Sequence, residues 1–183
     1  IQADIKAISA LGGYAASAIT AVTVQNTVGV TAVHPVPADI VEGQIRAVLD
    51  DIGAKAIKIG MLQSADIVHL IARLIKEYDI RNVVLDPVMV STSGHRLIEE
   101  TAISALQTEL IPLTRVITPN IPEAEILLDG NAITLQEDMP QAVKALSQRY
   151  HTSVLLKAGH LTEDNLVDYF YDAEQDELTL LPS

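Results

Sequence analysis

The spacing of hydrophobic and polar positions alternates between two patterns from residue 38 onward. Apolar side chains three or four positions apart predict helices, and short uninterrupted apolar runs such as Val83-Val84-Leu85 predict strands buried on both faces. The predicted helices span residues 38–49, 65–78, 99–110, 121–128 and 138–150, and the predicted strands span 56–59, 82–85, 116–118 and 153–156. Helices that alternate with such strands indicate a parallel sheet covered on both faces.

The two ends of the chain have different patterns. Residues 1–11 place isoleucine and leucine at helical spacing, which predicts a helix that ends at the following glycine pair. Residues 16–24 are apolar and β-branched enough to predict a buried strand, and a short strand at 30–33 follows. Near the other end, residues 167–171 and 178–181 flank an acidic turn, and we expect them to form an antiparallel hairpin at the sheet edge.

The composition is typical of one globular α/β domain, and we expect a single domain over residues 1–183. Hydrophobic residues make up 49% and charged residues 20% of the chain, which is enough for a substantial core. A net charge of −12 disfavours nucleic acid and anionic membrane surfaces as partners, because both would be repelled. The stretch contains no cysteine, which excludes disulfides and thiolate metal sites and favours a cytoplasmic location.

No Lys, Arg, Asp or Glu occurs between Ala7 and Ala38, so a membrane span has to be considered. Glycines, threonines and the Gln25-Asn26-Thr27 cluster divide this stretch into pieces too short and too polar to cross a bilayer. We therefore expect buried strands flanked by turns. The start does not resemble a signal peptide, since Asp4 and Lys6 stand where an apolar core would follow a basic leader.

Polar residues that directly follow apolar strands are the candidates for chemistry, because ligands of open parallel sheets bind beyond the carboxyl ends of the strands. Gln25 offers a donor and an acceptor in one plane, which suits the edge of a heterocycle, or it satisfies loop backbone. In the segment Lys58-Ile59-Gly60-Met61-Leu62, glycine permits a sharp turn. Met61 then suits either an apolar pocket wall or plain core packing.

Two further places carry charged side chains. Asp86 follows an apolar strand and precedes a proline-fixed turn that runs on to Ser91-Thr92-Ser93-Gly94, which suits a metal or phosphate site, or alternatively a cap. In the segment Thr118-Pro119-Asn120-Ile121-Pro122-Glu123, the second proline suits the first turn of a helix. Asn120 or Ile121 is then the cap, and Glu123 either complements the helix dipole or faces a ligand.

Lys157 ends a buried strand, where an ammonium group needs an anionic partner, and a phosphate is one candidate. His160 follows in a loop and is either a base or, more commonly, a surface residue. These residues do not form a complete catalytic constellation. Neither a GxxxxGK[ST] loop nor a GxGxxG turn is present, so a P-loop NTPase and a dinucleotide-binding domain are not supported, and no histidines have metal-ligand spacing.

In this order and spacing, the segments resemble the hydroxymethylpyrimidine kinase branch of the ribokinase-like superfamily. The resemblance is carried by Gln2-Ala3-Asp4-Ile5-Lys6, Ser9-Ala10-Leu11-Gly12, Val24-Gln25-Asn26-Thr27, Lys58-Ile59-Gly60-Met61-Leu62, Val83-Val84-Leu85-Asp86-Pro87-Val88-Met89, Ser93-Gly94, Ile117-Thr118-Pro119-Asn120-Ile121-Pro122-Glu123-Ala124 and Lys157-Ala158-Gly159-His160. It implies a ribokinase-like three-layer α/β/α fold with a mainly parallel sheet and an antiparallel edge hairpin. It also implies a homodimer.

The activity implied by this resemblance is ATP-dependent phosphorylation, with Mg2+, in thiamine biosynthesis. The substrates implied are 4-amino-5-hydroxymethyl-2-methylpyrimidine and its monophosphate, which becomes the diphosphate. The implied pyrimidine-binding residues are Gln25, Asp4, Met61 and Val88. The implied phosphate and metal residues are Asp86, Asn120 and Glu123, and Lys157 would steady the transferred phosphoryl group, as the positioning and charge stabilisation of phosphoryl transfer require.

Members of the family begin with a strand and a Gly-rich substrate loop, and end with a Gly-Thr-Gly segment that carries the general base and an anion hole. Neither segment occurs in these 183 residues, so we expect this stretch alone to be inactive. A pyridoxal kinase of the same superfamily is the nearest alternative, and Val24-Gln25-Asn26-Thr27 with Gly29-Val30 favours the pyrimidine branch. A non-catalytic pyrimidine-binding module is the alternative from another class.

Overall fold

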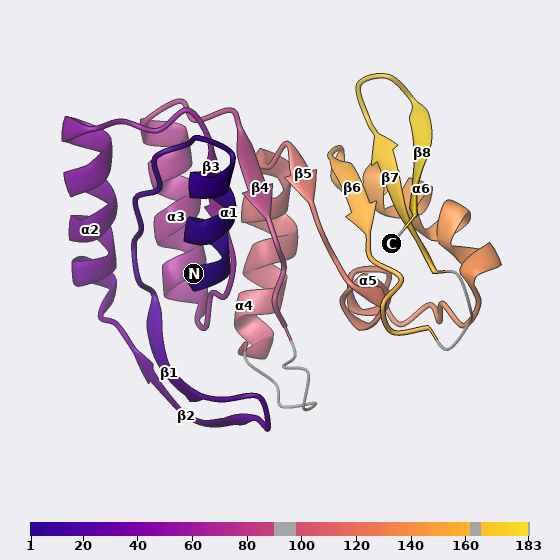
Figure 1. Ribbon diagram of the computed structural model, residues 1–183, viewed down its shortest axis with the longest axis horizontal. Helices are drawn as coiled ribbons and strands as arrows, with labels where there is room; N and C mark the ends of the chain where they lie inside the picture. Colours follow the sequence, from indigo (N-terminus) through magenta and orange to yellow (C-terminus); the bar gives the residue numbers. More distant parts are fainter. Residues whose placement is uncertain (90–97, 162–165, 183) are drawn as a thin grey trace.

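The central sheet of the computed structural model has the strand order β3-β4-β5-β6-β7-β8 (Figure 1). The structure describes residues 1–89, 98–161 and 166–182. The strands of this sheet are β3 (Ile57–Ile59), β4 (Val83–Leu85), β5 (Val116–Ile117), β6 (Ser153–Leu156), β7 (Val167–Asp172) and β8 (Glu177–Pro182). Neighbouring strands from β3 to β6 are parallel, whereas β7 pairs antiparallel with both β6 and β8. The predicted parallel sheet with an antiparallel edge hairpin is confirmed.

The helices follow the predicted order with small shifts at their ends. They are α1 (Gln2–Ala10), α2 (Ala38–Asp51), α3 (Ala65–Glu77), α4 (Glu100–Ala105), α5 (Ile121–Leu127) and α6 (Met139–Tyr150), and a short 3-10 turn, η3 (Gln136–Asp138), precedes α6. The helix expected over residues 99–110 leaves the α pattern after Ala105. It continues as a π-helix, η1 (Leu106–Leu110), and a 3-10 turn, η2 (Ile111–Leu113). Pro112 has no amide hydrogen to continue the ladder, which accounts for the end of the helix there.

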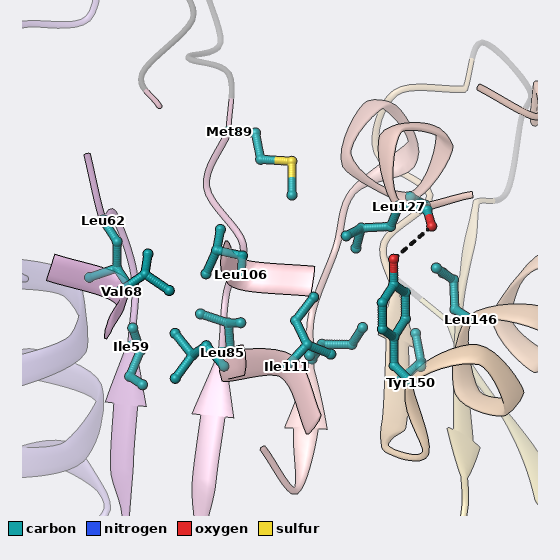
Figure 2. Close-up of a cluster of buried hydrophobic side chains, with 14 of the residues drawn as sticks. Ile59, Leu62, Val68, Leu85, Met89, Leu106, Ile111, Leu127, Leu146 and Tyr150 are labelled. Carbon is teal, nitrogen blue, oxygen red and sulfur yellow. Dashed lines mark hydrogen bonds between the residues drawn. The ribbon is translucent and has the colours of Figure 1, made fainter. Parts of the chain in front are cut away.

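The core lies between one face of the sheet and the helices behind it. In Figure 2, Ile59 and Leu85 on the strands face Val68 of α3 and Leu106 of η1, and all four side chains are buried. At the other end of this layer, the hydroxyl of Tyr150 donates a 2.9 Å hydrogen bond to the backbone carbonyl of Leu127. The apolar runs that predicted the strands therefore build one continuous core, which holds the strand ends in fixed positions.

The opposite face of the sheet carries α1. Along β3 the side chain of Lys58 alternates with Ile57 and Ile59, so it points away from the core, and it contacts Asp4 of α1. Figure 1 shows α1 on the other side of the sheet from α3. Helices therefore cover both faces, as expected for a three-layer α/β/α fold. No residue of α1 is buried.

A separate two-stranded ribbon joins α1 to the rest of the chain. β1 (Ala21–Gln25) pairs antiparallel with β2 (Val30–Pro35), outside the central sheet. The expectation of a buried strand over residues 16–24 is wrong in two respects, because the strand begins only at Ala21 and its valines are exposed. Val24, for example, is 60% exposed. A two-stranded ribbon outside the main sheet has no second apolar layer to bury its faces.

The ribbon is attached to the α/β part of the molecule at its base. The side-chain amide of Gln44 on α2 accepts a 2.9 Å hydrogen bond from the amide of Ile19 and donates a 3.0 Å bond to the carbonyl of the same residue. The hydroxyl of Thr20 donates to the carbonyl of Met61 at 2.9 Å. The ribbon leaves the body on the same side as the carboxyl ends of β3 and β4 (Figure 1).

No helix in the described ranges is long and apolar enough to cross a bilayer.

Candidate functional site

Asp86 is the centre of a polar cluster at the carboxyl edge of the sheet. It directly follows β4, and its backbone amide donates to the carbonyl of Ile59, which continues the sheet pairing for one more residue. Lys157, which directly follows β6, places its Nζ 2.9 Å from Asp86 Oδ1. Thr118 follows β5, the strand between them, and donates from Oγ1 to the same carboxylate oxygen at 3.1 Å. Parallel strands end at one edge, so residues far apart in the sequence meet here.

A second lysine approaches the same carboxylate from β3. Lys58 Nζ lies 4.0 Å from Asp86 Oδ2 and 3.1 Å from Asp4 Oδ1 on α1. The four charged side chains thus form a chain of alternating sign, from Asp4 through Lys58 and Asp86 to Lys157. Each of the four is partly exposed, with between 25% and 37% of the side chain accessible. Solvent and a ligand can therefore reach each of these four charged side chains.

The pKa of Asp4 is lower than that of an ordinary aspartate. Partial burial acts to raise the pKa, but the hydrogen bond and positive charge of Lys58 act in the opposite direction and lower it. Asp4 is consequently held in its ionised form beside Lys58. The contact between α1 and β3 at this point is a charged one.

The start of α5 is fixed by a reciprocal capping box. Asn120 Oδ1 accepts the backbone amide of Glu123 at 3.0 Å, and Glu123 Oε2 accepts the backbone amide of Asn120 at 2.9 Å. Asn120 also forms a parallel bridge with Lys157, so the cap stands beside the lysine. The sequence prediction that Asn120 or Ile121 caps this helix, with Pro122 in its first turn, is confirmed for Asn120.

Glu123 is buried, with only 2% of the residue exposed. Its second oxygen, Oε1, accepts a 3.4 Å hydrogen bond from the amide of Met89, in the segment that follows Asp86. Burial raises the pKa of Glu123, although the amides of Asn120 and Met89 and the charge of Lys157 oppose the rise. Glu123 therefore ties the chain after β4 to the start of α5, and both of its oxygens already accept backbone amides.

The residues expected around the pyrimidine occupy two different parts of the molecule. Met61 and Val88 are half-buried and follow β3 and β4 at the carboxyl edge. Gln25 ends β1 on the ribbon and is exposed. The loop backbone after it is satisfied by Asn26, whose Oδ1 accepts the amides of Val28 and Gly29. Asn26, and not Gln25, is therefore the side chain that satisfies the loop backbone.

His160 lies in the loop after Lys157 and is exposed. The segment Ser91-Thr92-Ser93-Gly94, which carries part of the family resemblance, lies outside the described residues. Sequence reasoning did not single out Lys58 or Thr118 as site residues. The signal for Lys58 was present, since it is a charged residue in the middle of an otherwise apolar strand.

A cavity of about 230 Å³ lies beside this edge, between the base of the ribbon and the start of α3. Its lining includes Thr20, Val36, Gln63 and Ser64, and Gln63 Oε1 has no hydrogen-bond partner within the described part of the chain. Asp86 and Lys157 do not line it.

Across residues 1–89, 98–161 and 166–182, no three acidic, histidine or cysteine side chains form a group that could hold a metal ion by themselves.

Known proteins match this chain over nearly its whole length. The family model described as "Phosphomethylpyrimidine kinase" matches residues 1–181. The hydroxymethylpyrimidine/phosphomethylpyrimidine kinase of Rhizobium meliloti is 46% identical over 184 residues, which cover all of this chain and 68% of that protein. The thiamine biosynthesis bifunctional protein ThiED of Geobacter sulfurreducens is 45% identical over 172 residues, or 94% of this chain and 35% of that protein. The chain therefore spans about a third of the bifunctional relative.

Solved structures agree with the fold. The crystal structure of phosphomethylpyrimidine kinase from Clostridium difficile 630 superposes with a TM-score of 0.88 at 41% identity, and covers 100% of this chain and 77% of that chain. The pyridoxal kinase of Bacillus subtilis, solved as an ADP complex, gives a TM-score of 0.85 at 33% identity, with coverage of 100% and 68%. The ribokinase-like fold expected from the sequence is confirmed, and the phosphomethylpyrimidine kinase shares more residues with this chain than does this pyridoxal kinase.

Proposed function

The chain belongs to the phosphomethylpyrimidine kinase family, and from this premise we propose that its protein phosphorylates 4-amino-5-hydroxymethyl-2-methylpyrimidine and then its monophosphate, with ATP, in thiamine biosynthesis. The observation that carries the proposal is the contact of Asp86 with Lys157 at the carboxyl edge of the sheet. A phosphotransferase needs a cation for the transferred phosphoryl group and a carboxylate near the metal-bound phosphates, and this pair supplies both.

Lys157 has the position of the phosphoryl-binding cation. In the first step the substrate hydroxyl oxygen forms a bond to the γ-phosphorus of ATP, the bond from that phosphorus to the β,γ-bridging oxygen breaks, and ADP leaves with the electron pair. Negative charge on the transferring oxygens then competes with Asp86 for the Lys157 ammonium. Lys157 is 37% exposed, so it can turn from one anion to the other. The base that takes the hydroxyl proton is predicted in the Gly-Thr-Gly segment of the family.

Asp86 is the residue of this chain that best suits contact with the metal. Mg2+ in kinases is bound largely by phosphate oxygens and water, with one or two carboxylates, and when bound it offsets the charge that develops on the phosphates. Asp86 Oδ2 fits this requirement, since its 4.0 Å separation from Lys58 Nζ is too long for a hydrogen bond. Asn120 and Glu123 support the site from the α5 cap, and Glu123 acts by positioning Asn120 and the Met89 amide.

The pyrimidine is assigned to Asp4, Met61 and Val88. Asp4 is a partly exposed carboxylate beside Lys58, and Met61 and Val88 offer apolar side chains at the carboxyl edge of the sheet. Gln25 would reach the ring edge from the ribbon, as its paired donor and acceptor suggest.

A cytoplasmic location and a homodimer stay predictions, which cell fractionation and light scattering would check.

The test is an ADP-release assay on the purified protein that contains this chain, with Mg-ATP and three acceptors in parallel. We expect turnover with the pyrimidine alcohol and with its monophosphate, and much slower turnover with pyridoxal. Faster turnover with pyridoxal would identify a pyridoxal kinase instead. Tight binding of the pyrimidine without any ADP release would favour a non-catalytic module. Either result would refute the proposed function.

A further inference from the structure

The ammonium of Lys58 lies between the two halves of the proposed site. On one side, 3.1 Å away, is Asp4, the residue assigned to the pyrimidine, and on the other, 4.0 Å away, is Asp86, the residue assigned to the phosphates and metal. The sequence and the proposed mechanism of the first step leave Lys58 without a function. A lysine in the middle of a strand that is otherwise apolar needs an explanation beyond packing.

The second step needs a cation that the first step does not need. In the first step the acceptor is a neutral alcohol, whereas in the second it is a phosphate that carries negative charge at neutral pH. This phosphate is attached to the pyrimidine and attacks the γ-phosphorus, so it must lie between the pyrimidine and the transferred group. Lys157 is already assigned to the transferred group. A separate positive charge between Asp4 and Asp86 is therefore required, and Lys58 occupies that place.

Lys58 is free to accept such a ligand. Its side chain is 36% exposed, and the 4.0 Å separation from Asp86 Oδ2 is too long for a hydrogen bond. An ammonium has more N–H donors than the single contact with Asp4 uses, so other donors remain for phosphate oxygens. Gly60 has no side chain to crowd this approach, and even a Cβ there would stand 3.5 Å from Nζ.

We propose that Lys58 binds the phosphate of the pyrimidine monophosphate and thereby determines the use of the second acceptor; this inference rests on the proposed function. In the second step, an oxygen of that phosphate forms a bond to the γ-phosphorus of ATP, and the bond from this phosphorus to the β,γ-bridging oxygen breaks. ADP leaves with the electron pair. The attacking oxygen is already anionic, so no proton has to be removed. Lys58 offsets the repulsion between the two phosphate groups.

The experiment compares the two acceptors in Lys58→Met, Lys58→Arg and a matched control. Lys58→Met keeps the length of the side chain and removes its charge. We expect it to raise the KM for the monophosphate by about 10–100-fold and the KM for the alcohol by less than about 3-fold, because specificity is the difference between the two affinities. Lys58→Arg, which restores the charge, should recover most of the monophosphate use. Lys55→Met removes an exposed lysine before β3 and should change neither acceptor.

Each outcome has a defined consequence. Equal losses for both acceptors in Lys58→Met would overturn the role of Lys58 and leave the proposed function intact. Wild-type protein that uses the alcohol but not the monophosphate would overturn it together with the second step of the proposed function, whereas wild-type protein that uses neither would refute the proposed function as a whole. If Lys58→Met does not fold, Lys58→Gln, which can still hydrogen-bond Asp4, replaces it. Equilibrium binding of the monophosphate and the alcohol without ATP then gives the same comparison.

Discussion

Residues 1–40, here called the N-terminal region, and residues 41–182, here called the α/β body, are both rich in apolar side chains, yet only the body buries them. No residue of the N-terminal region is buried, and the first buried side chain along the chain is Val41. In the body, strands and helices bury their apolar faces against one another. An apolar pattern therefore specifies a helix or a strand, while burial requires a second layer to pack against.

The two regions also divide the proposed site. The body supplies Asp86 and Lys157, which are held by strand ends and by hydrogen bonds to neighbouring residues. The N-terminal region supplies Asp4 and Gln25, two of the residues assigned to the pyrimidine. The regions meet at the ion pair of Asp4 with Lys58 and at the base of the ribbon. Phosphoryl transfer is thus expected to depend on the body, whereas recognition of the pyrimidine is expected to need side chains from both regions.

The largest effect is expected at the site in the body. Replacing Lys157 with alanine removes the cation proposed for the transferred phosphoryl group, so kcat should fall by about 10²–10³-fold, with a smaller change in the KM for the pyrimidine. ADP-release kinetics on the full protein measure both quantities. Lys55→Ala, a change of another exposed lysine, serves as the control. A Lys157→Ala variant that unfolds at lower temperature but keeps its kcat would show that Lys157 serves only as the structural partner of Asp86.

Two strand valines test the difference in burial directly. Val83 on β4 is fully buried, whereas Val24 on β1 is 60% exposed. We expect Val83→Ala to lower the free energy of unfolding by about 2–3 kcal/mol, because it loses buried methyl groups and leaves a cavity. Val24→Ala should change it by about 0.5 kcal/mol or less. Urea denaturation measures both, and similar losses would contradict the division between the two regions.

Gln25 tests whether the exposed ribbon takes part in substrate binding. Gln25→Ala should weaken use of the pyrimidine by about 10–100-fold, because a ring edge would lose its paired donor and acceptor. The KM for ATP should hardly change. Gln148→Ala, which removes an exposed glutamine from α6, provides the matched control. Steady-state kinetics with a normal pyrimidine KM and kcat in Gln25→Ala would exclude this residue from the site.

The smallest effect is expected where the ribbon is attached. Gln44→Ala removes both hydrogen bonds to Ile19, and each is worth on the order of 1 kcal/mol. Because the ribbon contributes no buried residue, we expect faster amide hydrogen exchange across β1 and β2 and little change in exchange within the core. Asp51→Ala, at the exposed end of the same helix, should change neither. Faster exchange in β4 as well would mean that the ribbon stabilises the body.

Much of the fold and part of the site were predictable from local sequence. Helix α3 and strand β6 fall within one or two residues of their predicted bounds, since strong apolar periodicity and buried packing agree there. Asn120 was predictable as a cap because capping depends on residues adjacent in the sequence. The prediction of a buried strand at 16–24 was wrong, because a run of apolar residues does not indicate which other element will pack over it. The role of Lys58 was missed for a similar reason, since its partners lie on α1 and after β4.

The order of elements, the parallel sheet and the polar residues at strand ends followed from the sequence alone, because each is visible in a pattern of residues close together along the chain. Three features became visible only in the folded molecule: Lys157 pairs with Asp86 across β5, Lys58 stands between Asp86 and Asp4, and the ribbon is exposed. Contacts between residues so far apart in the chain depend on strand order and layer packing. These are global properties of the fold, which no local pattern specifies.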